Sequence, residues 1–193
     1  MATISLENLH VATLTSDESG ITPVYEAPVY VGKSVSANIT SNENVSSFYA
    51  EGEFAAEDTV FQGVDVEINI ADLTNEMQQL LLGHTKNTDG VTEQKIGDEA
   101  PWVALGFSAK KANGEVRYIW LYKGKFRLPS ASYSAKTDSS EYQTNAISSR
   151  FVQRESDKKV KGTVDSDVVG DPLITAMVLD EWFDYVYGTA PIV

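Results

Sequence analysis

The chain has 193 residues, of which 42% are hydrophobic and 22% charged, and this composition is typical of one soluble globular domain. It contains no cysteine, which excludes disulfides, thiolate nucleophiles and cysteine-ligated metals. Its 28 acidic residues against 15 basic ones give a formal charge of −13, which excludes gripping of a nucleic-acid backbone by a basic surface.

The N-terminal third predicts short strands followed by one segment without clear periodicity. Alternating apolar residues place strands at 8–14, 24–31 and 35–39. Residues 40–59 are polar and acidic but contain Phe48, Tyr49 and Phe54. We interpret them as a long functional loop whose aromatic residues are buried by another chain, with an unrecognised strand as the alternative.

A strand and a helix are predicted next. Residues 60–70 predict a strand in which Val64, Val66, Ile68 and Ile70 would face a core, so Asp65 and Glu67 would lie on the wet face. The helix should begin with Asp72 or Thr74 as its N-cap and end at Gly83, which suits the left-handed position after a helix.

Residues 101–127 predict a long hairpin at the centre of the sheet. Asn113-Gly114 is a preferred pair for a two-residue type I′ turn. With that turn Ala112 would pair with Glu115, and Phe107 would lie opposite Trp120 in an aromatic ladder on one face.

The last part of the chain predicts strands at 146–154 and 158–164, and then a C-terminal helix. Asp171-Pro172 has the form of an N-cap followed by proline at the first helical position, and the apolar stripe continues to residue 187. The first eight residues lack a basic patch, and the longest apolar run, 173–179, is far shorter than the roughly 20 residues that span a bilayer. We therefore expect no signal peptide and no contact with a membrane.

Charge is distributed in blocks along the chain. The net charge is −4 over residues 1–50, −10 over 51–100, +7 over 101–162 and −6 over 163–193. Either basic strands neutralise acidic ones within one subunit, or opposite patches attract in head-to-tail self-association. In the second case assembly should weaken as salt rises.

No constellation of residues indicates catalysis. The phosphate-loop, dinucleotide, nucleophilic-serine and zinc-protease motifs are absent. His10 and His84, the only histidines, fit structural positions in a strand and after a helix. The carboxylate pairs Asp65 with Glu67 and Asp165 with Asp167 are explained better as solvated surface than as a metal or acid–base site. We predict no enzyme, no catalytic residue, no cofactor and no metal.

Several segments together resemble the major tail protein, the tail-tube subunit, of long non-contractile-tailed phages of Gram-positive hosts. The strongest are APWVALGF at 100–107 and WLYKGKF at 120–126. The others, which occur in the same order along the chain, are 72–74 with 81–83, 89–91, 136–144 and 182–183.

The resemblance implies a single tail-tube domain over residues 1–193, a β-sandwich or half-barrel with one or two helices. It implies hexameric rings, formed when subunits join their sheets, that stack into the tail tube of the virion after synthesis in the host cytoplasm. The implied partners are other copies, the tape-measure protein and tail-end proteins, while DNA passes through the lumen without specific binding. The family has no catalytic residues to transfer.

On this hypothesis the predicted loop with Phe48, Tyr49 and Phe54 contacts the next ring. Asp65 and Glu67 are possible acids of the lumen, where a negative wall would let DNA slide. The alternative is an immunoglobulin-like or capsid-decorating binding module, which would share the β pattern. A hydrolase that uses a carboxylate pair is the third hypothesis.

Overall fold

The structure is a computed structural model that describes residues 3–32, 34–50, 53–71, 73–129, 145–167 and 178–189. Among these residues the longest α-helix is α1 (Asn75–Leu82), which has about two turns. The strands are β1 (Thr3–Ser16), β2 (Val24–Tyr25), β3 (Val29–Gly32), β4 (Ser34–Ala50), β5 (Glu53–Ile70), β6 (Thr85–Lys86), β7 (Thr92–Glu93), β8 (Val103–Lys111), β9 (Val116–Phe126), β10 (Asn145–Val152) and β11 (Lys161–Asp165).

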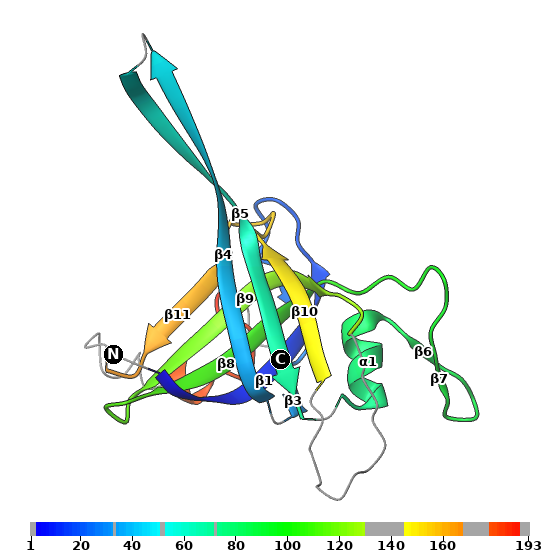
Figure 1. Cartoon of the computed structure of the whole chain (residues 1–193). Coiled ribbons are helices and arrows are strands. Elements are labelled where there is room, and N and C mark those ends of the chain that lie inside the picture. Colours follow the sequence, from blue (N-terminus) through cyan, green and yellow to red (C-terminus); the bar gives the residue numbers. More distant parts are fainter. Residues whose placement is uncertain are drawn as a thin grey trace, which may run out of the picture.

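Most of these strands form one antiparallel sheet that bends over itself. The order is β2-β1-β8-β9-β10-β5-β4, with β3 also paired to β1 and β11 also paired to β9. In Figure 1 the layer of β4, β5 and β10 crosses in front of β1, β8 and β9, and the small β6–β7 hairpin lies beyond α1. The prediction of a mainly β sandwich or half-barrel is confirmed.

The main core lies between the two layers. Val64, Val66, Ile68 and Ile70 of β5 are all buried, which confirms the predicted alternation of this strand. They pack in one cluster with residues of β1, β8, β9, β10 and α1. The apolar stripe of α1 thus closes one side of this core.

The β8–β9 turn is one residue longer than predicted. The amide of Lys111 donates to the carbonyl of Glu115 at 2.7 Å, and the amide of Gly114 donates to the carbonyl of Lys111 at 3.0 Å. Gly114 has a φ of 89°, which is typical of the last residue in a three-residue loop that begins as a type I turn. The Asn113-Gly114 pair suits a two-residue loop as well as this three-residue loop, so the pair alone does not fix the loop length.

This longer loop changes which residues face each other across the hairpin. Phe107 pairs with Ile119, and Trp120 lies opposite Gly106 on the other face of the sheet. The predicted ladder of Phe107 with Trp120 is therefore wrong. Trp120 belongs instead to a second apolar cluster, which the C-terminal residues Trp182 and Val186 cover.

Helix α1 confirms its predicted ends. The hydroxyl oxygen of Thr74 accepts a hydrogen bond from the amide of Met77 at 3.3 Å, as an N-cap does. Gly83 follows the last turn with a φ of 74°, and its amide donates to the carbonyl of Gln79.

The predicted C-terminal helix ends earlier than expected. Of residues 171–187, positions 171–177 lie outside the described residues, 178–180 are helical, and turns follow from 181 onward. The indole of Trp120 donates to the carbonyl of Trp182 at 2.9 Å, so this carbonyl binds the sheet instead of continuing a helix. The extension of the helix to residue 187 is therefore wrong.

Within the segment 40–59, predicted as a loop with a strand as the alternative, residues 40–50 and 53–59 belong to two long strands. β4 and β5 pair continuously from Ser34 with Ile70 to Ala50 with Glu53, apart from three register shifts. The prediction of a loop is wrong because a strand shows hydrophobic alternation only where one of its faces is buried. The outer half of this hairpin extends past the neighbouring strands and away from the body (Figure 1).

Candidate assembly site

The projecting half of the β4–β5 hairpin is the most distinctive feature of the molecule. We call residues 42–50 of β4 and 53–63 of β5 the arm. The last residue of β5 that pairs with β10 is Val64, which lies opposite Phe151. Beyond Val64, β4 and β5 pair only with each other among the described strands. The arm is therefore a two-stranded ribbon, a structure that is at best marginally stable in water without support.

The root of the arm exposes apolar side chains. Val45, Val60 and Phe61 are 52%, 53% and 42% exposed, whereas the inward residues of β5 in the body are buried. By the strand register Val45 and Phe61 lie on one face of the ribbon and Val60 on the other, and exposed apolar groups of this size on a projecting ribbon are typical of an interaction surface. Sequence analysis missed these three residues because it placed two of them at the start of a core strand and one in a loop.

The arm and the strands that carry it are strongly acidic. Residues 34–70 contain seven acidic residues and no basic one. These acids are Glu43, Glu51, Glu53, Glu57, Asp58, Asp65 and Glu67. A partner for the arm must therefore tolerate or neutralise negative charge beside the apolar contact.

The aromatic residues predicted to mediate assembly fall near the end of the arm. Phe48 pairs with Ala56, and Tyr49 pairs with Phe54, in the register of the two strands. Their side chains lie outside the described part of the structure. The backbone thus places all three residues on the arm, as the hypothesis of a contact segment requires.

Asp65 and Glu67 lie two residues apart on the solvent face of β5, below the arm. The side-chain amide of Asn42 donates to the carboxylate of Asp65 at 2.5 Å. Both acids line a shallow depression of about 220 Å³ that Arg127 also lines. Because a basic residue lines the depression together with the two acids, this face is mixed in charge rather than uniformly negative.

The second predicted carboxylate pair, Asp165 with Asp167, forms salt bridges with basic residues of the same chain. Arg117 donates to Asp165 through two nitrogens, at 2.6 and 2.8 Å, and Lys111 lies 2.8 Å from Asp165 and 3.1 Å from Asp167. Arg117 and then Lys111 lower the pKa of Asp165 well below its usual range, although burial opposes them. Within the described ranges no group of three or more potential ligands could hold a metal ion.

Other residues of the basic block also pair inside the subunit. The ammonium of Lys123 lies 2.8 Å from Asp17, and that of Lys125 pairs with Glu99. Together with Arg117 and Lys111, these pairs connect the basic block to each of the three acidic blocks. Neutralisation within one fold is therefore a large part of what the charge blocks do.

The two histidines occupy structural positions. His10 lies on β1, and its ring stacks on Phe183 with 4.6 Å between ring centroids. His84 is buried just after α1, and its Nδ1 lies 3.1 Å from a carboxylate oxygen of Asp98. The amide of Lys95 and then His84 lower the pKa of Asp98. His84 and Asp98 line a pocket of about 530 Å³ together with polar residues and with the apolar residues Phe126 and Leu128.

Comparison with known proteins adds no relative. No family model matches the sequence, and no curated protein matches it. Across the described ranges, no helix has both the length and the hydropathy that a membrane crossing requires.

Proposed function

We propose that this chain is a structural subunit that assembles with copies of itself into stacked rings and a tube, with the arm as its contact to a neighbouring copy. The observation that carries the proposal is the projecting two-stranded arm with exposed Val45, Val60 and Phe61. The sequence resemblance to phage major tail proteins supplies the form of the assembly, hexameric rings around a lumen.

The direction of the arm supports a contact between different surfaces of two copies. The arm points away from its own body (Figure 1), so its apolar surface must be covered by something other than its own sheet. When a projecting element of one subunit binds a different surface on the next, the contact is heterologous, and such contacts generate rings or filaments. Burial of the arm between copies would also stabilise a ribbon that is marginal alone.

Asp65 and Glu67 remain the proposed lumen acids of this tube. Their position on the solvent face of β5 is compatible with that role. The nearby Arg127 weakens the field that they would present to DNA. Within the proposal the tape-measure protein and tail-end proteins are further partners, and the virion tail is the location.

Electron microscopy of the purified, concentrated protein tests the proposal. Hollow tubes or rings in projection are the expected result. Separate single particles at every concentration would contradict self-assembly and favour the alternative of a capsid-decorating or immunoglobulin-like binding module.

Substitutions on the arm test which surface makes the contact. The triple variant V45S, V60S, F61S should stay folded but remain in the supernatant when assemblies are pelleted. The control is the triple variant I21S, V29S, V91S, which removes three aliphatic side chains of similar exposure from the body. Equal pelleting of the two variants would show that the arm does not carry the contact.

The predicted aromatic contact is tested in the same way. The variant F48S, Y49S, F54S should also lose the pellet while keeping the circular dichroism of a folded β protein. Normal tubes from this variant would show that the outer part of the arm is not needed for assembly.

A further inference from the structure

The arm leaves the sheet at an irregular point in β5. The pairing of β4 with β5 shifts between Asn42 opposite Gly63 and Glu43 opposite Phe61, so Gln62 is the extra residue of a β-bulge. A bulge bends its strand and increases the local twist. Figure 1 shows β4 and β5 crossing over each other just above the body, where the arm begins.

Gly63 makes this bulge possible. Its φ is 138°, a backbone conformation that residues with a side chain rarely adopt. A Cβ at this position would lie 2.8 Å from the carbonyl oxygen of Phe151 in β10. The backbone of β5 therefore passes β10 at a distance that only glycine permits.

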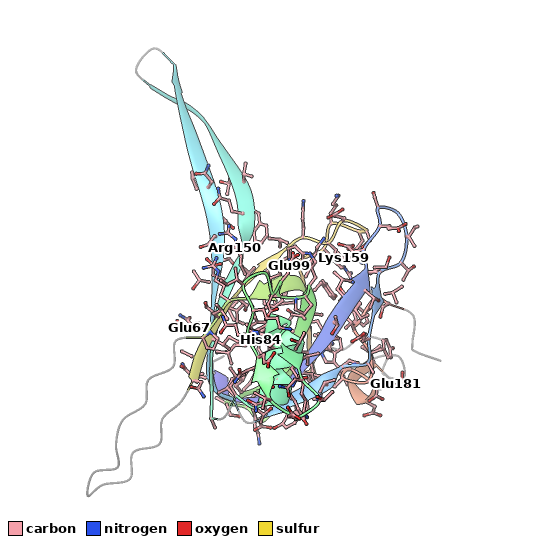
Figure 2. All side chains as sticks on the ribbon, turned by 90° about the vertical axis from the view of Figure 1, so that its right-hand side faces the viewer. Glu67, His84, Glu99, Arg150, Lys159 and Glu181 are labelled. Atoms are coloured by element: carbon pink, nitrogen blue, oxygen red, sulfur yellow. The ribbon has the colours of Figure 1, made fainter. Side chains whose placement is uncertain are left out.

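Arg150 of β10 supplies the hydrogen bond that the bulge leaves unmade. An extra residue in a ladder has no backbone partner on the opposite strand. Arg150 Nη2 donates to the carbonyl of Gln62 at 3.2 Å, and the side chain also passes beside Gly63. Figure 2 shows Arg150 where the arm joins the body. On the β4 side, the carboxylate of Asp65 accepts the amide of Asn42, the last paired residue before the shift.

We propose that the Gln62–Gly63 bulge and Arg150 form a built joint that turns the arm out of the sheet and fixes its direction before any partner is bound. Arg150 acts as a positioning residue, because it holds the bulged backbone from the neighbouring strand. A direction fixed in advance lowers the entropy that docking of the arm would lose. The joint does not depend on which partner the arm meets.

Distance measurement between two spin labels tests the joint directly. The chain has no cysteine, so N44C on the arm and K161C on β11 would label only the chosen sites. Both residues are exposed, and dilution with unlabelled protein restricts the signal to distances within one subunit. We expect a single narrow distance distribution for the otherwise unchanged protein.

In this labelled background R150M should shift and broaden the distribution, because the carbonyl of Gln62 loses its donor. R150K retains one donor and should restore a narrow distribution, which a general loss of stability would not do. R127M removes the arginine that directly follows β9, whose side chain makes no hydrogen bond to the described residues of β4 or β5, and should leave the distribution unchanged. R150A, which also has no side-chain donor, is the second variant, to be read in the same way if R150M does not fold.

Two results would overturn the proposal. One is a distribution in R150M or R150A that matches that of the parent protein. The other is a broad distribution in the parent protein itself, which would mean that the arm has no fixed direction. Neither result bears on whether copies assemble, since the pelleting of arm variants is read separately.

Discussion

At the scale of single residues, Asp17 connects two loops that are far apart in the sequence. Its carboxylate accepts hydrogen bonds from the ammonium of Lys123 and from the amides of Glu155 and Ser156, all between 2.8 and 2.9 Å. Burial alone would raise the pKa of Asp17, but these donors more than offset it and hold the pKa well below its usual range. The pair with Lys123 is nearly removed from water, with 6% of the Asp17 side chain and 7% of the Lys123 side chain exposed.

We predict that D17N lowers the free energy of unfolding at pH 7 by about 3 kcal/mol, because the variant leaves a buried ammonium with one partner fewer. Urea unfolding measures the change. The control E18Q, at the exposed neighbouring position, should change stability by less than about 0.5 kcal/mol. A similar loss in both variants would mean that Asp17 contributes only as one more surface charge.

The same substitution has a predictable pH dependence. The pKa of Asp17 is lower in the folded than in the unfolded chain, so its stabilisation is complete above the unfolded value of about 3.9 and is lost as the pH falls below it. The difference in stability between D17N and the parent protein should therefore shrink below about pH 4. A difference that stays constant from pH 7 to pH 3 would contradict the lowered pKa.

At the scale of elements, the β8–β9 hairpin shows that one additional loop residue changes which side chains share a face of the sheet. In the observed register Gly106 lies opposite Trp120, and a Cβ at Gly106 would come within 2.6 Å of the indole ring. In the register predicted from a two-residue turn, Phe107 would occupy that place instead. Because side chains alternate between faces, the slip moves the aromatic residues of β9 to the other side of the sheet.

We therefore predict that G106A destabilises the protein by about 1–3 kcal/mol through overpacking against the buried Trp120. Denaturant unfolding of G106A, W120L and the double variant gives the coupling between the two sites. The penalty of G106A should largely vanish in the W120L background. Additive effects would contradict the contact and with it the register.

The sequence predicted elements well where local chemistry decides the structure. The caps of α1 at Thr74 and Gly83 and the buried face of β5 follow from residue type and period alone. The arm could not be predicted in this way, because a ribbon that buries neither face shows no hydrophobic alternation in its sequence. The early end of the C-terminal helix could not be predicted either, because there the indole of Trp120, which is far away in the sequence, donates a hydrogen bond to the carbonyl of Trp182.

The candidate site was predicted only in part. Phe48, Tyr49 and Phe54 drew attention because aromatic residues are unexpected in an acidic loop, and they lie on the arm. Gly63 inside a strand pattern was a signal for a bulge that could have located the root of the arm. Nothing local marks Arg150, since its role depends on the pairing of β10 with β5.

At the scale of the whole molecule, the ion pairs change the expected effect of salt. One of the two interpretations of the sequence was attraction between opposite blocks on two copies, and hence weaker assembly in salt. In the structure Lys111, Arg117, Lys123 and Lys125 pair with acids of their own chain, while residues 34–70 contain seven acids and no base. Copies with a net charge of −13 repel each other, and salt screens that repulsion.

We now predict that assembly strengthens as salt rises from about 0.05 to 0.5 M, over which the screening length falls through about 10 Å near 0.1 M. Light scattering at fixed protein concentration measures it. Assembly that weakens over this range would show that charge pairs between copies dominate, as the sequence first suggested.

The central claim is that the arm of one copy is buried against another copy. The most direct test places a photoreactive benzophenone amino acid at position 61, with position 91 of the body as the control. On illumination of the concentrated protein, label at position 61 should give covalent dimers and higher species on a denaturing gel, and label at position 91 should give far fewer. Only monomer from position 61, under conditions where the protein is concentrated and folded, would contradict the claim.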